Sequence, residues 1–155
     1  MWKMNFLDEP HVRLLERDGI IEIGGEVDWD MFRYVREALL YLAAFGNPPL
    51  KCYITSDGGL VNIGLDIYDM IRLYPGTTTG VVRGYARSMA AVILQACTTR
   101  EMARHSSILI HHVSRRQISL DVLRSPRKLA KEHASSERDQ AKLYSILSER
   151  VGKSV

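Results

Sequence analysis

The sequence has few cysteines and no long apolar run, and both absences limit what the protein can be. The two cysteines, Cys52 and Cys97, lie in apolar stretches without CxxC or Cys/His metal-ligand spacing. We therefore expect buried free thiols, no metal and no need for an oxidising compartment. No run reaches the roughly 18–20 apolar residues that span a membrane, and the N-terminus lacks the apolar core and small-residue cleavage site of a secretion signal. These absences predict a cytoplasmic protein with no membrane partner.

The 155 residues also carry little excess charge, with a net charge of +3, 25% charged residues and 46% hydrophobic residues. This composition is typical of one globular domain. Residues 113–142 carry eight basic and four acidic side chains, a net charge of +4, and could face DNA or another anionic partner. A charge run on a helix is more commonly a solvated face, so we do not expect a nucleic-acid partner.

Apolar periodicity predicts strands that alternate with helices, which is the pattern of an α/β domain. The predicted strands are 20–23, closed by Gly24-Gly25, then 50–55, 77–82, one near 101–104 and 107–113. The predicted helices are one from the N-cap Asp28 to Gly46, then 62–73, an apolar one from Ser88 to Cys97, and a long polar one from Ser125-Pro126 to about Arg150, ending at Gly152. We expect strand 50–55 to be buried on both faces.

Two places put backbone N–H groups where an anion could bind. Gly58-Gly59 follows a strand and opens a helix, and glycine lets the backbone come close to a ligand. Ser88 precedes the apolar helix, whose first N–H groups could stabilise an oxyanion. Taken alone, each has an ordinary structural explanation, a turn for the glycines and an N-cap for Ser88.

A serine nucleophile needs a base, and His111 and His112 end the apolar strand "ILIHH". Adjacent strand residues point to opposite faces, so the two rings cannot bind one metal ion. One of them could serve Ser88 as a base, although a histidine at a strand end is more often structural.

The order of several motifs is more specific than any one of them. "TSDGG", "GLDIYDMI", "GYARSMAA" and "ILIH" follow one another with the spacing of the Clp protease proteolytic subunit family (ClpP), which residues 12–113 resemble. The resemblance implies that Ser88 is the nucleophile of a serine peptidase and His111 its general base. It also implies that the backbone N–H groups of Gly59 and Met89 form the oxyanion hole, with no cofactor.

The resemblance further implies a ClpP/crotonase-like α/β fold, a spiral of strand–strand–helix units with a protruding C-terminal helical handle. Residues 1–155 would form one peptidase domain, with a head of about 1–113 and a handle of about 119–150. Family members form seven-membered rings stacked in pairs, cut unfolded polypeptides and peptides, and work with a Clp ATPase. We expect the same partners here.

The family's third triad acid lies in an Arg-Asp element after the long helix, and the resemblance places that element beyond Val155. No residue of this sequence takes its position, since Asp139 falls too early, inside the predicted helix. We therefore expect these residues to lack the C-terminal end of the family domain. Two hypotheses follow: an ATP-dependent Clp-type serine endopeptidase subunit, or a catalytically inert ClpP-like assembly subunit.

Overall fold

The computed structural model describes residues 9–114 and 118–152 of the chain. They form two compact units, which divide between Ile110 and His111. Within the described residues, no helix is both long and apolar enough to cross a membrane.

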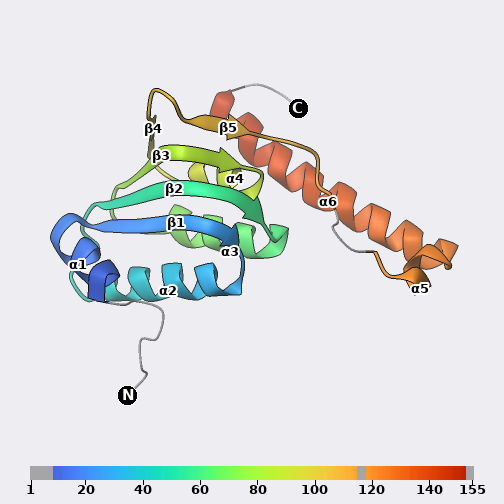
Figure 1. Ribbon diagram of the computed structural model, residues 1–155, viewed down its shortest axis with the longest axis horizontal. Helices are drawn as coiled ribbons and strands as arrows, with labels where there is room; N and C mark the ends of the chain where they lie inside the picture. The colour runs from blue at the N-terminus through green and yellow to red at the C-terminus, as the bar shows by residue number, and fades with distance from the viewer. Residues whose placement is uncertain (1–8, 115–117, 153–155) are drawn as a thin grey trace, which may run out of the picture. The chain divides into compact units, whose positions relative to one another are not determined.

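The first unit is built on a five-stranded sheet in which every pairing is parallel (Figure 1). Its strands are β1 (Ile20–Val27), β2 (Leu50–Gly59), β3 (Thr78–Arg87), β4 (Thr99–Met102) and β5 (Ser107–Leu109). Strands β1 to β4 are neighbours in sequence order, and β5 pairs with β3 further along the edge that β4 uses. The fold is therefore α/β, as the sequence predicted.

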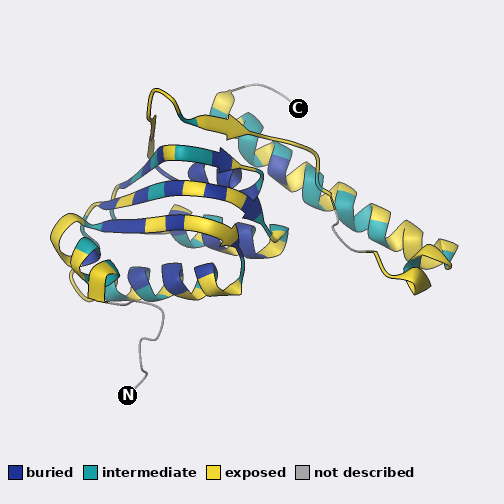
Figure 2. Cartoon of the chain, in the orientation of Figure 1, coloured by how far each residue is buried: buried dark blue, intermediate teal, exposed yellow. Residues whose placement is uncertain are grey.

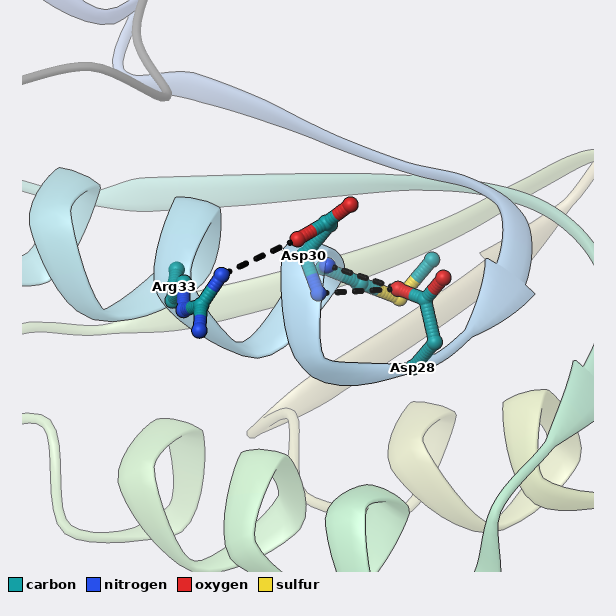
Figure 3. Close-up of polar contacts among 4 residues, drawn as sticks. Asp28, Asp30 and Arg33 are labelled. Carbon is teal, nitrogen blue, oxygen red and sulfur yellow. Dashed lines mark hydrogen bonds and ion pairs between the residues drawn. The ribbon is translucent and has the colours of Figure 1, made fainter.

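Helices α2 (Trp29–Ala43), α3 (Val61–Arg72) and the short α4 (Met89–Leu94) connect consecutive parallel strands and cover one face of the sheet (Figure 1). Helix α1 (Glu9–Asp18), which the sequence analysis did not predict, packs on β1. Helix α2 begins as predicted, because the Asp28 carboxylate accepts the N–H groups of Asp30 and Met31, both at 3.0 Å (Figure 3).

The core lies between the helices and one face of the sheet (Figure 2). In β2 buried residues alternate with more exposed ones, so that Cys52 and Ile54 are buried while Lys51 and Thr55 are exposed. The prediction that this strand is buried on both faces is therefore wrong. A lysine and a threonine in alternate positions fit a sheet with one solvated face.

The strands also continue beyond their predicted ends. The predicted first strand closed at Gly24-Gly25, whereas β1 continues through both glycines and has a bulge before Glu26. β2 and β3 extend to Gly59 and Arg87. In contrast, β5 ends at Leu109, so His111 and His112 lie beyond the strand that was expected to carry them.

The second unit contains α5 (Leu120–Leu123) and the 26-residue helix α6 (Pro126–Val151). The predicted ends of the long helix are confirmed. Ser125 accepts the Lys128 N–H at 3.4 Å, and Gly152 ends the helix with a left-handed backbone, φ 66°.

Candidate active site

The first three strands of the sheet end side by side. Gly58 and Gly59 are the last two residues of β2, and because Gly58 has a positive φ we call this bent strand end the Gly58–Gly59 turn. Gly59 is opposite Val27 of β1, and Ser56 of β2 is opposite Ala86 of β3. The carboxyl ends of parallel strands are the usual place for a site in an α/β sheet. The residues that follow these strand ends are therefore candidates for a functional site.

Ser88 is the junction between β3 and α4, and its backbone has φ 51° and ψ −123°. A residue other than glycine in such a conformation costs on the order of 1–3 kcal/mol, so the surrounding structure must hold it. The Ser88 N–H donates to the Leu109 carbonyl of β5 at 2.8 Å. This hydrogen bond fixes the junction to the neighbouring strand.

The Ser88 side chain forms no capping hydrogen bond to α4 within the described residues. Ser88 therefore occupies the N-cap position of α4, as the capping interpretation expected, but its side chain does not make the hydrogen bond of a cap. A half-buried serine at a strained strand-to-helix turn is also the arrangement that presents the nucleophile in α/β-hydrolases. The sequence around Ser88 lacks the GxSxG pattern of those enzymes, so only the backbone geometry reveals this likeness.

Gly58 is in close contact with this junction. It has φ +88°, and a Cβ atom added to it would lie 2.7 Å from Ser88 Cβ and 2.8 Å from the Met89 backbone nitrogen. On the other side of the turn, a Cβ at Gly59 would lie 2.4 Å from the Val27 carbonyl oxygen. Both positions therefore require glycine. The turn fills the space between the end of β1 and the start of α4.

Ser56 holds this turn from inside the protein. It is fully buried, and its hydroxyl donates to the Gly25 carbonyl at 2.6 Å and accepts the Gly58 N–H at 3.1 Å. A buried hydroxyl with both roles satisfied orders the groups that it joins. Ser56 is not among the predicted site residues, since only its alternation with exposed neighbours marks it as buried.

Met89 is held at its position by close packing of α4 on α3. It is 1% exposed, and a Cβ at Gly64 would lie 3.1 Å from Met89 Cβ. The start of α4 is thus fixed by Gly64 on one side and by the Gly58 turn on the other. The backbone N–H groups at the start of a helix have no acceptor within the helix, which is the property an oxyanion hole needs.

On the solvated face, Asp57 and Arg87 join the same two strand ends. Arg87 Nη1 lies 2.8 Å from Asp57 Oδ1, and the Arg87 guanidinium stacks on the Tyr85 ring at 4.4 Å. This pair was not predicted from the sequence, because the two residues are 30 positions apart.

His111 is the first residue of the second unit. Its Nδ1 lies 2.6 Å from the His112 carbonyl oxygen. A carbonyl only accepts, so Nδ1 carries the hydrogen and Nε2 of the neutral ring is the basic nitrogen. The following residues are fixed to α6, because Val113 N–H donates to Gln140 Oε1 at 2.6 Å and the Tyr144 hydroxyl lies 2.9 Å from His112 Nδ1.

Of the predicted site residues, Ser88 and Met89 are consecutive, and Gly58, the neighbour of Gly59, is in close contact with both. Asp139, already rejected as the third triad acid, lies inside α6. Among residues 9–114 and 118–152, no three His, Cys, Asp or Glu side chains are arranged to hold a metal ion.

The first unit has a parallel sheet, helices on one face of it and a serine at a strand-to-helix turn. α/β proteins with such a turn include hydrolases that carry their nucleophile there. The sequence comparisons narrow this class. The model of the Clp protease family matches residues 8–155, and the chain belongs to that family.

Two curated relatives are ATP-dependent Clp protease proteolytic subunits. The one from Ligilactobacillus salivarius is 39% identical over 102 residues, which are 64% of this chain and 51% of that protein. Subunit 3 from Rhodococcus jostii is 37% identical over 114 residues, 72% of this chain and 56% of that protein. The chain thus spans about half the length of these relatives.

A solved structure of a ClpP1 mutant from Listeria monocytogenes has a similar fold. Its TM-score is 0.77 at 24% sequence identity, and the match covers 88% of this chain and 74% of that one. The chain therefore has the ClpP-like fold, with a long C-terminal helix.

Proposed function

We propose that this chain is a Clp-type proteolytic subunit that hydrolyses peptide bonds, with Ser88 as nucleophile and His111 as general base. The observation that carries the proposal is the contact of Gly58 with Ser88 and Met89, because it joins the two expected sources of oxyanion-hole donors at one place. In this mechanism Ser88 Oγ attacks the scissile carbonyl while His111 Nε2 accepts its proton. The backbone N–H groups of Gly59 and Met89 then bind the oxyanion. Such a donor contributes about 3 kcal/mol to the transition state.

The pairing of Ser88 with His111 is part of the proposal. Its support is the anchoring of Leu109 to the Ser88 N–H, only two residues before His111. The His112 carbonyl supports the tautomer that this role requires.

The proposal includes the assembly and partners that the resemblance implies: seven-membered rings, unfolded polypeptide substrates and a Clp ATPase. The relatives' names describe ATP-dependent proteases. Sedimentation of the purified chain tests the assembly. A particle of seven or fourteen times the 17.6 kDa chain mass is expected, and a monomer at every concentration contradicts ring formation.

A fluorophosphonate probe tests the catalytic part of the proposal. We expect the probe to label the native protein at Ser88 and to leave the Ser88→Ala variant unlabelled. His111→Ala should lower the labelling rate by a factor of at least about 1,000, since triad members act as a unit. Labelling of Ser88→Ala at the native rate, or full peptide hydrolysis by it, contradicts the proposal.

The second hypothesis, an inert assembly subunit, is favoured by one observation. The Nδ1 partner that orients His111 is a carbonyl oxygen, where a triad would use a carboxylate. Removing the orienting carboxylate from a triad lowers the rate by about 10⁴. Ring assembly without probe labelling of Ser88 would support this second hypothesis over the first.

A further inference from the structure

The ion pair between Asp57 and Arg87 lies at the point where β2 and β3 stop pairing with each other. The register of the two strands shifts between Ile54 and Ser56 and ends at the pair Ser56–Ala86. Asp57 and Arg87 are the next residue on each strand, and Arg87 Nη1 lies 2.8 Å from Asp57 Oδ1. A side-chain contact therefore continues the connection beyond the last paired residues.

The two residues also flank the contact on which the oxyanion hole depends. Asp57 precedes Gly58, and Arg87 precedes Ser88. A Cβ at Gly58 would lie 2.7 Å from the Arg87 carbonyl oxygen, so the backbones beside the ion pair already touch. Ser56 holds the turn from the buried face of the sheet, while the ion pair joins the same strand ends on the solvated face.

Arg87 is itself restrained on this face. Its guanidinium stacks on the Tyr85 ring at 4.4 Å, and its side chain is 45% exposed against 61% for Asp57. An ion pair exposed to this extent adds little to the free energy of unfolding. The ion pair can still affect the reaction rate through the position of a hydrogen-bond donor, because small displacements of a catalytic donor have large effects on rate.

We propose that the Asp57–Arg87 ion pair is a positioning device, which holds the Gly58–Gly59 turn against the start of α4 and so sets the spacing of the two oxyanion-hole donors. The donors belong to β2 and to α4, two elements far apart in sequence, and their spacing depends on how the two strand ends meet. This inference rests on the proposed function for its effect on rate. Its effect on the turn does not depend on activity.

The test uses Asp57→Ala, Arg87→Gln and the double variant in the full chain. Each single variant should lower the maximal rate of fluorophosphonate labelling about tenfold and change the half-saturating probe concentration by less than about twofold. This is a milder loss than the roughly 100-fold that a 1 Å misplacement can cause. The double variant should label no more slowly than either single variant, because both remove the same contact.

The second measurement is amide hydrogen exchange at Gly58, whose N–H donates to the buried Ser56 hydroxyl. Each single variant should raise this exchange rate about tenfold, while the denaturation midpoint of the unit changes little. The exchange rate at Gly58 tests the positioning role even if the wild-type protein is not labelled. Absence of labelling would count only against the proposed function.

Two control variants match the change at Arg87. Arg33→Gln removes an exposed arginine whose ion pair with Asp30, at 3.3 Å, lies within α2 and joins no two strands (Figure 3). Tyr85→Leu removes the ring under Arg87 and leaves the ion pair. Arg33→Gln should change neither readout, and Tyr85→Leu should change both less than Arg87→Gln does. Unchanged Gly58 exchange in both single variants, or rate losses that multiply in the double variant, would overturn the inference.

Discussion

The two units of the chain are stabilised by different interactions. Among the described residues, every buried apolar side chain except Leu143 lies in the first unit. The helix α6 of the second unit has 26 residues, and only Leu143 among them is buried. A helix of this kind depends on its caps and on local side-chain pairs, whereas the first unit is stabilised by its core.

This difference explains why the strained backbone conformations of the candidate site lie in the first unit. The positive φ of Ser88 and the tight Gly58 turn occur in the first unit, where burial on several sides can hold a strained backbone. The proposed base His111 lies at the start of the second unit, where hydrogen bonds along the chain and to α6 provide the order. Variants in the two units test this contrast.

The largest expected difference comes from truncating one apolar side chain in each unit. Ile67 of α3 is 0% exposed, and Ile67→Ala should lower the free energy of unfolding by about 2–5 kcal/mol because it leaves a cavity. Leu129 of α6 is 40% exposed, and Leu129→Ala should cost less than about 1 kcal/mol. Urea denaturation followed by circular dichroism measures both. Equal losses would remove the contrast between the units.

A glycine comparison within the first unit separates backbone strain from close packing. Gly58 and Gly25 have similar φ values, +88° and +77°, but an added Cβ meets backbone atoms at Gly58 and nothing within 4 Å at Gly25. Gly25→Ala should therefore cost about 1 kcal/mol, from strain alone. Gly58→Ala should cost about 3 kcal/mol and abolish probe labelling. If the two variants lose the same stability, close contact at Gly58 is not the reason for its glycine.

The N-caps of the two long helices allow a smaller comparison. Asp28 accepts two N–H groups at 3.0 Å (Figure 3), and Ser125 accepts one at 3.4 Å. Asp28→Ala should cost about 1–2 kcal/mol and shift the whole unfolding transition of the first unit. Ser125→Ala should cost about 0.5 kcal/mol and lower only the helical signal. A global shift caused by Ser125→Ala would show that α6 unfolds together with the core.

Burial of the thiols should make the stability of the protein depend modestly on pH. The Cys97 side chain, as a hydrogen-bond partner, and burial raise the pKa of the Cys52 thiol well above its ordinary value. An unfolded thiol ionises near pH 8.5, so the unfolded chain loses its proton first. The stability contributed by Cys52 is complete below about pH 8 and declines as the pH rises further. Denaturation midpoints between pH 7 and 10 should fall less in Cys52→Ala than in the wild type.

Native thiols should also resist alkylation at pH 8 until the protein is unfolded, since Cys52 and Cys97 are both buried. Rapid reaction of either thiol in the folded protein would contradict this burial.

The sequence predicted the order of strands and helices because apolar periodicity and the caps at Asp28, Ser125 and Gly152 are local signals. It did not predict the extension of β2 through "SDGG", whose residues favour turns. Pairing of Gly58 and Gly59 with β1 keeps that segment in the sheet despite the positive φ of Gly58, and such pairing is not visible in a local window. Helix α1 was missed because its sequence has few apolar positions and many charges.

The candidate site shows the same limit. The resemblance predicted the roles of Ser88 and Gly59 from their motifs, but the positive φ of Ser88 depends on contacts with Gly58 and Leu109, which lie about 20–30 residues away. The Asp57–Arg87 pair likewise requires the register of two strands. His111 was expected within a strand because the apolar run continues to Ile110, whereas pairing with β3 stops at Leu109.

The order of the strands has a consequence for how the protein is made. Because β1 to β4 are neighbours in the order of the sequence, each new strand that leaves the ribosome finds the edge of its partner already synthesised. The sheet can therefore grow in one direction during translation. The junction at Ser88 is an exception, since its N–H donates to the carbonyl of Leu109, which is synthesised 21 residues later. We expect the nascent chain to form its core before the junction at Ser88 is complete.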